Sequence, residues 1–357
     1  MKNLRQASLA DLEQLMSEIK EPKFRAAQIH DWIWKKYASS IDDMTNLPKE
    51  LRKSLSEHYF IPKVSIDFSQ FSNDGTIKNR LKLHDNLITE SVLIPTEKRM
   101  TVCVSSQVGC SLSCKFCATG YLKRSRNLDF DEIVDEITLV NEQAEKHFGR
   151  HLSNIVFMGM GEPLLNYKNL LKAIDKITSP EGLGMSPRRI TVSTAGVTKM
   201  IKQLGDDEVK FRLAVSLHAG NDEKRNKIMP INETNDLKSL AEALNYFYSK
   251  TKSLVTLEYI LFKDLNDSIQ DADELVKFYR RVPADLVNII EYNSIDQADF
   301  SKPEEQEVDN FMAYLEKHRV NARLRRSRGK DIDAACGQLA NVERPASIDD
   351  EQFSANK

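Results

Sequence analysis

The sequence predicts an α/β protein built on a partial (β/α)6 barrel, with a small N-terminal helical domain and a short β extension. From residue 101 onward, short apolar runs of strand length alternate with amphipathic runs of helix length, and such alternation favours parallel βαβ units. Residues 1–60 show the helical period alone, whereas residues 61–100 contain short β-branched runs separated by turn residues. A chain of 357 residues has room for one large barrel and a small accessory domain.

Composition narrows the class of protein. Hydrophobic residues make up 41% and charged residues 29% of the chain, which is ordinary for a soluble globular protein. The formal net charge of −2 gives no general attraction to nucleic acid, so an RNA-binding surface must be a local basic patch. The sequence has no apolar run of membrane-spanning length and no apolar signal-peptide core near its first residue, so we expect no membrane partner.

Residues 1–60 are expected to form the helical accessory domain. Periodicity predicts helices over residues 9–19, 24–37 and 49–59. Ser8 can cap the first helix, with Asp11 three residues later as its capping-box partner. For Trp32 and Trp34, we favour a place in the hydrophobic core over a role as a platform on which RNA bases stack.

Residues 61–100 are expected to form an antiparallel extension. Short β-branched runs over residues 64–68, 76–83 and 87–94 are separated by turn signals. Glu90 lies on the last run, where composition alone favours a solvated side chain.

Residues 101–343 are expected to form the barrel core, followed by a polar tail at 344–357 that lacks periodicity. The predicted strands cover residues 101–105, 155–160, 190–194, 211–217, 254–262 and 286–290. The predicted helices cover residues 129–148, 164–177, 195–204, 237–249 and 269–281. Active sites of such barrels form where the strands end.

Three cysteines, Cys110, Cys114 and Cys117, follow the first core strand with three and then two residues between them. Thiolates are soft ligands, and such close spacing lets them converge on one metal centre. A zinc site would need a fourth ligand, for which Cys103 is available although it lies in a predicted strand. A four-iron cluster with one iron left open for a small molecule needs only the three. Four of the five cysteines fall within 15 residues, which suits a metal site in a reducing cytosol better than a disulfide framework.

Small polar groups recur where the predicted strands end. Gly161 allows close approach of a ligand to the backbone, and Glu162 places a carboxylate at the mouth of the pocket. The other candidate positions are Ser193, then Ser216, Leu217 and His218, and finally Asn293. Each alone is more often a cap or turn residue, but their recurrence at one end of successive strands favours a ligand site. For His218, hydrogen bonding is a safer prediction than proton transfer.

Cys336 stands more than 200 residues after the cysteine triad, between Ala335 and Gly337. A buried inert thiol is the simplest interpretation, but its polar, glycine-containing surroundings argue against it. A basic run lies just upstream and consists of Arg323, Arg325, Arg326, Arg328 and Lys330. Such a run is either a solvated face or a surface that neutralises phosphates while a nearby thiol acts.

Taken together, these motifs resemble the RlmN family of radical S-adenosylmethionine (SAM) enzymes, the dual-specificity RNA adenine-C2 methyltransferases. The resemblance covers nearly the whole chain and rests on CVSSQVGCSLSCKFCATG, FMGMGEPLLN, RRITVSTAGV, LAVSLHA, IMPIN and RGKDIDAACGQLA. The triad alone would indicate only the superfamily, whereas its combination with DAACGQLA is specific to the family.

The resemblance implies two cofactors and their residues. A [4Fe–4S] cluster would be held by Cys110, Cys114 and Cys117, and two SAM molecules would be used per turnover. The SAM site would consist of Gly161, Glu162, Ser193, Ser216, Leu217, His218 and Asn293.

It also implies a reaction. Cys336 would be methylated on sulfur, and a 5′-deoxyadenosyl radical would take a hydrogen from that methyl group so that the carbon adds to adenine. Cys103 would then attack the sulfur of Cys336, forming a transient disulfide, and Glu90 would remove the ring proton as general base. An external electron donor of flavodoxin-like type would be required, and we expect a cytoplasmic monomer.

The substrates implied are 23S rRNA, near the peptidyl-transferase centre, and tRNA, at the adenine 3′ to the anticodon. Two alternatives remain open. The related Cfr methyltransferases modify carbon 8 of the same ribosomal adenine, although they tend to have Ala where Pro163 follows Glu162 here. A non-catalytic, zinc-stabilised RNA-binding module would have no use for Cys336.

Overall fold

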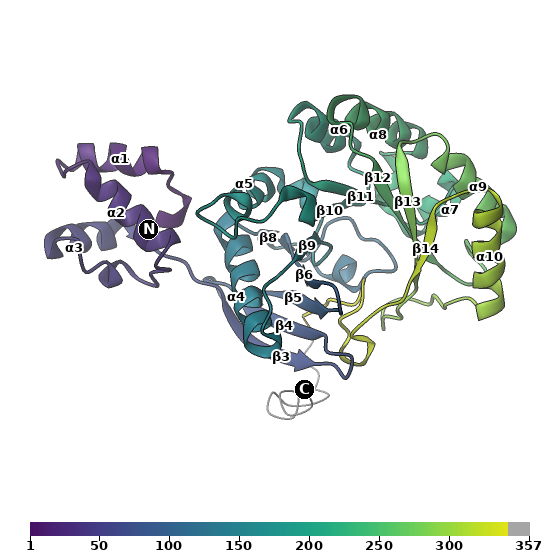
Figure 1. Ribbon diagram of the computed structural model, residues 1–357, viewed down its shortest axis with the longest axis horizontal. Coiled ribbons are helices and arrows are strands. Elements are labelled where there is room, and N and C mark those ends of the chain that lie inside the picture. Colours follow the sequence, from purple (N-terminus) through teal and green to yellow (C-terminus); the bar gives the residue numbers. More distant parts are fainter. Residues whose placement is uncertain (342–357) are drawn as a thin grey trace.

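The computed structural model describes residues 1–341, and the predicted tail at 344–357 lies outside the described residues. Parallel strands form one side of a single ten-stranded sheet: β6 (Met100–Cys103), β9 (Asn154–Phe157), β10 (Ile190–Thr194), β11 (Arg212–Ser216), β12 (Val255–Leu261), β13 (Ala284–Glu291) and β14 (Ala322–Arg325). Three antiparallel strands complete the sheet beside β6, in the order β5 (Ile88–Pro95), β4 (Ile77–Lys82) and β3 (Ser65–Phe71). The sheet curves around a central space, with the helices along its outer side (Figure 1). These features confirm the predicted α/β class.

The core helices connect the parallel strands, as βαβ units require. They are α4 (Phe130–Phe148), α5 (Tyr167–Thr178), α6 (Thr198–Asp206), α7 (Asp222–Ile228), α8 (Leu237–Thr251), α9 (Ile269–Tyr279) and α10 (Glu305–Lys317). Single 3-10 turns occur at η1 (Leu4–Gln6), η2 (Ile41–Asp43), η3 (Ala118–Tyr121), η4 (Pro163–Asn166), η5 (Pro187–Arg189), η6 (Pro230–Glu233) and η7 (Lys330–Ile332).

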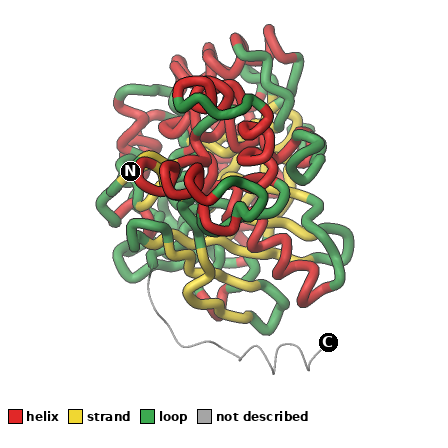
Figure 2. Tube along the Cα trace, turned by 90° about the vertical axis from the view of Figure 1, so that its left-hand side faces the viewer, coloured by secondary structure: helices red, strands yellow, loops and turns green. Residues whose placement is uncertain are grey.

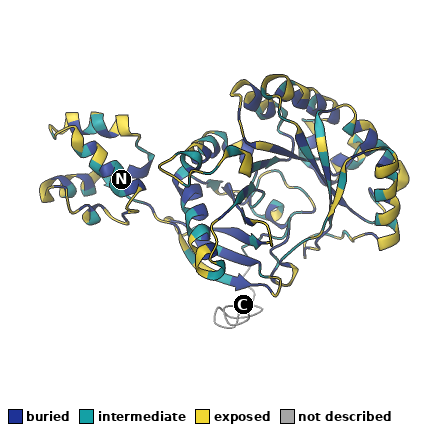
Figure 3. Ribbon diagram, in the orientation of Figure 1, coloured by how far each residue is buried: buried dark blue, intermediate teal, exposed yellow. Residues whose placement is uncertain are grey.

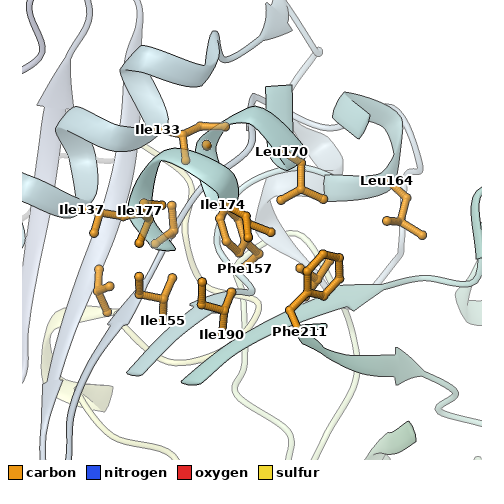
Figure 4. Packing of buried hydrophobic residues seen from close by; sticks show 14 of the residues in the cluster. Ile133, Ile137, Ile155, Phe157, Leu164, Leu170, Ile174, Ile177, Ile190 and Phe211 are labelled. Atoms are coloured by element: carbon orange, nitrogen blue, oxygen red, sulfur yellow. The ribbon is translucent and has the colours of Figure 1, made fainter. Parts of the chain in front are cut away.

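The hydrophobic core lies between the helices and the outer face of the sheet. Figure 3 shows that the strands are largely buried and that exposed residues gather on the outer surfaces of the helices. Figure 4 shows side chains of α4 and α5 pointing toward β9 and β10. The labelled residues include Ile133, Ile137, Leu170, Ile174, Ile177, Ile155, Phe157 and Ile190, all in one buried cluster. Burying each such side chain contributes roughly 1.5–3 kcal/mol to the stability of the fold relative to leaving it in water. This packing holds the strands, and with them the strand ends, in place.

The N-terminal helices stand at one end of the molecule (Figures 1 and 2). They are α1 (Leu9–Glu18), α2 (Phe24–Trp34) and α3 (Lys49–His58), close to the predicted ranges, and the short strands β1 (Lys2–Asn3) and β2 (Tyr59–Phe60) pair beside them. The predicted capping box is present, because the Ser8 hydroxyl accepts from the Asp11 N–H at 3.1 Å and Asp11 accepts from the Ser8 N–H at 2.8 Å.

Polar and aromatic contacts join this part to the barrel. The Arg5 guanidinium donates to Asp135 on α4 at 2.6 Å. Trp34 is buried and its ring stacks on Phe130 at a centroid distance of 5.7 Å, as the core interpretation predicts. Trp32 is half-buried.

Three elements of the core were not predicted. Strand β14 lies in the residues interpreted as a basic run, and α7 and α10 were not expected at all. Strand β14 pairs with β13, but two of its four residues are arginines and its leucine is exposed. The strand therefore lacks the alternation of apolar and polar residues by which a strand is recognised in a sequence.

Candidate active site

The cysteine triad lies in a loop that leaves the carboxyl end of β6. Two short antiparallel strands, β7 (Gln107–Val108) and β8 (Arg126–Asn127), close this loop at its base. Inside it, the Cys117 N–H donates to the Cys114 carbonyl at 3.2 Å, and the Gly120 N–H donates to the Cys117 carbonyl at 2.8 Å. The tight turns bring all three cysteines to the wall of one cavity.

The triad suits a cluster better than a single zinc ion. Cys103, the candidate fourth ligand of a zinc site, does not line the cavity that the three cysteines of the triad line. A [4Fe–4S] cluster with one open iron needs only the three thiolates. Burial raises the pKa of Cys110 to about 11 and raises those of Cys114 and Cys117 as well, so metal binding would release protons.

The cavity beside the triad has an empty volume of about 890 Å³, including the part open to solvent. Of the seven predicted SAM-site residues, the structure places Gly161, Glu162, Ser193, Ser216 and His218 on its wall. Leu217 and Asn293 do not line it. Leu217 is fully buried behind the wall, and Asn293 instead donates to Ser327 at 2.9 Å and to the Cys336 carbonyl at 3.3 Å.

Glu162 joins two strand ends. Its carboxylate accepts from the Leu164 N–H at 3.0 Å and from the Ala195 N–H at 2.8 Å. Gly161 precedes it with φ +92°, where a Cβ would lie 2.5 Å from the Gln107 side chain, so only glycine fits there. Burial raises the pKa of Glu162 to about 7.

His218 is buried and neutral. Its Nδ1 accepts from the Ile260 N–H at 3.1 Å, and the ring of Phe116 meets it edge-on at 4.8 Å. Burial, and then the charge of Arg225, lower the pKa of His218 to about 3. These surroundings favour the hydrogen-bonding interpretation over that of a proton carrier.

Glu258 on β12 is a wall residue that the sequence did not reveal. It is buried, it lines the cavity, and its Oε2 makes no hydrogen bond within the described chain. Arg325 on β14 lies 3.7 Å away, and Asn288 donates to the other oxygen at 2.8 Å. Oε2 is thus ion-paired with Arg325 but accepts no hydrogen bond within the described residues, so it can accept one from a polar ligand in the cavity. A lone Glu within an otherwise apolar strand was the available signal.

A second cavity, with about 1180 Å³ of empty volume, adjoins the first. Cys103 lines the second cavity, and Cys336 and Arg325 line both. The thiol of Cys103 is enclosed in apolar surroundings that raise its pKa, and the positive charge of Arg325 partly opposes that rise. The structure therefore brings together the two thiols that the sequence left far apart.

The disulfide expected between Cys103 and Cys336 is not present. All five cysteines of the chain are free. The pairing was expected only as a transient product of turnover, and a resting enzyme holds both residues as thiols.

The basic run divides among different roles. Arg325, Arg326 and Arg328 line the second cavity, and Arg99 joins them from the turn before β6. Lys330 instead pairs with Glu291 at 2.7 Å. Arg323 does not line either cavity.

Glu90 is buried on β5 and lines neither cavity. Its Oε2 accepts from the N–H groups of Ala340 at 2.9 Å and Asn341 at 3.1 Å, and its Oε1 lies 3.7 Å from Lys78. Contrary to the composition-based expectation of a solvated side chain, burial raises the pKa of Glu90. Strand alternation places it on the same face of the sheet as Cys103, which pairs with Val92.

Comparison with known proteins identifies the family. Residues 2–61 match the ribosomal RNA large subunit methyltransferase N-terminal domain, and residues 104–278 match the radical SAM superfamily. The probable dual-specificity RNA methyltransferase RlmN of Christiangramia forsetii is 54% identical over 340 residues, covering 95% of this chain and 96% of that protein.

The chain belongs to the RlmN family. A dual-specificity RNA methyltransferase RlmN from Campylobacter concisus is 41% identical over 95% of this chain and 91% of that protein. The crystal structure of a radical SAM methyltransferase from Sphaerobacter thermophilus superimposes with a TM-score of 0.86 at 37% identity, covering 95% of this chain and 99% of that one. As a radical SAM family, the RlmN family uses a [4Fe–4S] cluster and SAM. No helix within residues 1–341 is long and apolar enough to span a membrane.

Proposed function

We propose that this chain methylates carbon 2 of adenine in 23S rRNA, near the peptidyl-transferase centre, and in tRNA, at the adenine 3′ to the anticodon. One observation carries the proposal. Cys336 lies on the walls of both cavities, so a methyl group on its sulfur can be reached from the cofactor cavity and presented to the arginine-lined one. Family membership supports the reaction class.

The cofactors are assigned to the first cavity. Cys110, Cys114 and Cys117 would hold the [4Fe–4S] cluster, and the SAM site would consist of Gly161, Glu162, Ser193, Ser216, Leu217, His218 and Asn293. Once bound, these groups supply a methyl group and a carbon radical. The protein's own part is to orient them and exclude water. Asn293 contributes from behind, because its amide holds the Cys336 carbonyl.

The thiols divide the remaining work. Cys336 carries the methyl carbon on sulfur, which makes the addition to adenine effectively intramolecular. Cys103 would then attack that sulfur as a thiolate, so that an S–S bond forms and the S–C bond breaks. The electron pair of the S–C bond stays with the carbon on the base, which takes up a proton and leaves as the methyl group of the product. An external dithiol restores both thiols. The charge of Arg325 favours the thiolate form of Cys103.

Glu90 is assigned as the base that removes the ring proton. A carboxylate with a raised pKa is a stronger base than an ordinary one, and burial provides this. Oε2 is engaged by the Ala340 and Asn341 N–H groups. Oε1 lies 3.7 Å from the Lys78 ammonium, and it is the oxygen that we assign to accept the proton.

RNA is assigned to the second cavity, with Arg99 and Arg326 facing phosphates, whereas Arg328 pairs with Asp74 at 3.5 Å. An unstacked base entering this cavity would meet Cys336 and Cys103 together. The electron donor is a flavodoxin-like reductant, and the protein acts as a cytoplasmic monomer. We further propose the functional division into residues 1–60, 61–100 and 101–343 given by the sequence.

The test is anaerobic reconstitution with iron, sulfide, SAM, a reductant and unmodified ribosomal RNA or tRNA, followed by mass spectrometry of the nucleosides. We expect 2-methyladenosine, which Cys336→Ala abolishes. The matched variant Cys103→Ala should still methylate Cys336 but stop at a covalent protein–RNA adduct. An 8-methyladenosine product would overturn the assignment of carbon 2. A colourless, zinc-containing protein without methylated product would overturn the enzymatic function.

A further inference from the structure

Arg225 on α7 is fully buried, and its partners within the described chain are all neutral. Its Nε donates to the Leu217 carbonyl at 3.0 Å, and Nη1 donates to Asn232 Oδ1 at 2.6 Å. Its Nη2 donates to the carbonyls of Ala195 at 2.7 Å and Ser216 at 3.1 Å. A buried charge without a paired counter-charge is costly, and this guanidinium hydrogen-bonds only to neutral groups within the described residues, so a nearby anion would stabilise it.

The nearest link to a carboxylate is indirect. The Asn232 amide donates to Asp222 Oδ1 at 2.9 Å, and the same oxygen accepts from the Leu237 N–H at 2.9 Å. Within the described residues Asp222 forms no ion pair with Arg225, although its negative charge partly opposes the lowering of the Arg225 pKa by burial. Burial lowers the pKa of Arg225 to about 10, and the side chain remains a cation at neutral pH.

The segment that carries Arg225 packs directly against the cysteine loop. The Lys115 N–H donates to the carbonyl of Ile228, the last residue of α7, at 3.0 Å. Ile228 and Met229 share an apolar cluster with Cys114 and Cys117. Ala195 and Ser216, whose carbonyls accept from Arg225 Nη2, line the same cavity as the three cysteines of the triad.

We propose that Arg225 is the counter-charge of the cluster held by Cys110, Cys114 and Cys117, and that it raises the midpoint potential of that cluster. The inference rests on the cluster assignment made above. Three thiolates give the cluster a net negative charge, and one-electron reduction by the external donor adds another. Net charge and nearby charges set such potentials, and a fixed cation in a medium of low dielectric favours the reduced form.

The same residue positions the cofactor site. Its carbonyl partners Ala195, Ser216 and Leu217 lie at the ends of β10 and β11. A merely structural clamp would account for these hydrogen bonds but would not move a potential. The test must therefore separate charge from geometry.

The experiment is a redox titration of the reconstituted full-length protein in the absence of SAM and RNA. Electron paramagnetic resonance monitors the fraction of reduced cluster at each potential. Arg225→Met removes the charge, and Arg225→Lys keeps it while losing most of the donors. Asn232→Asp leaves Arg225 in place and puts a carboxylate at the 2.6 Å contact. We expect the Met and Asp variants to favour the oxidised cluster at least tenfold more than the unmodified protein, about 59 mV for one electron, and the Lys variant to stay close to the unmodified protein.

Several results would overturn the proposal. Equal midpoint potentials in all four proteins would show that the charge of Arg225 does not affect the cluster. If the potential of the Lys variant shifts as far as that of the Met variant, the hydrogen bonds of Arg225, and not its charge, are responsible. Equilibrium binding of SAM to the same four proteins is measured separately, and a change in SAM affinity without a change in potential would show that Arg225 is instead the counter-charge of the SAM carboxylate. Iron and sulfide per chain are measured in parallel. An unmodified protein that binds no cluster refutes the cluster assignment itself, whereas a Met variant that fails to load leaves the Lys and Asn232→Asp comparison to decide.

Discussion

At the scale of single residues, burial decides which chemical groups are available. Cys103, Glu162 and His218 are ionisable groups whose surroundings favour their neutral forms. Desolvation is the leading cause in each case. These side chains therefore add little charge to the site. Arg225 and Arg325 are cations whose charges act on its thiols.

His218 gives a pH-dependent prediction for stability. Its pKa is about 3 in the folded protein and about 6.5 when unfolded, so the unfolded chain binds more protons between these values. The free energy of unfolding should therefore fall as pH drops from about 6.5 to about 3. In His218→Asn, an amide oxygen can replace Nδ1 as acceptor, and asparagine tolerates the local φ of 55°.

Denaturant unfolding of the two proteins as a function of pH checks this. The unmodified protein should lose stability more steeply on acidification, by up to about 1.4 kcal/mol per pH unit. Parallel curves would contradict a buried, neutral imidazole.

At the scale of elements, the β7–β8 pair and the glycines within its loop shape the cysteine site. Gly109 has φ +74°, and a Cβ there would lie 2.5 Å from the carbonyl of Lys123, which lies on the returning side of the loop. The backbone cannot yield as a flexible side chain can. The loop therefore depends on glycine at this position for its closure.

Gly109→Ala should lower the cluster content after reconstitution several-fold, because the two sides of the loop must separate. Gly149→Ala is the matched control. Gly149 also has a left-handed φ, of +59°, at the end of α4, but no heavy atom lies within 4 Å of its added Cβ. Iron and sulfide analysis with absorption spectroscopy measures the outcome, and equal loss in both variants would show that backbone strain alone, not loop closure, is responsible.

At the scale of the whole molecule, the ten-stranded sheet joins three stretches of sequence around one interior. β5 contributes Glu90, β6 contributes Cys103, and the segment after β14 contributes Cys336. The last segment is fastened to the antiparallel strands, because Asp331 accepts from Ser72 at 2.6 Å and from the Asn73 N–H at 3.1 Å. Segments more than 200 residues apart in the chain thus form the second cavity.

The arginines around that cavity predict how RNA affinity depends on salt. Arg99 and Arg326 are exposed, line the cavity and have no ion-pair partner within residues 1–341. Replacing either by Ala should weaken RNA binding and reduce the slope of log affinity against log salt by about 0.7 to 0.9. Lys202→Ala, an exposed lysine on α6 outside the barrel, is the control. Filter-binding titrations at several salt concentrations measure these slopes. Equal slopes in all variants would contradict the assignment of RNA to this cavity.

The sequence by itself determined most of the elements and the family. Helical and strand periodicity located α1 to α3 and six of the parallel strands within a few residues, because local packing imposes those periods. The cysteine spacing located the metal loop, and the motifs identified the family. The residues of β14 and α7 show no periodic apolar pattern, so periodicity did not reveal these two elements.

Only the tertiary structure decided what those residues meet. It placed Cys336 on the walls of two cavities, kept Leu217 and Asn293 off the wall of the cofactor cavity, buried Glu90 beneath Ala340 and Asn341, and gave Arg225 neutral carbonyl and amide oxygens as hydrogen-bond acceptors. The physical reason is that desolvation and pairing depend on neighbours distant in the chain. Sequence spacing does not record those neighbours, and the curvature of the sheet creates them.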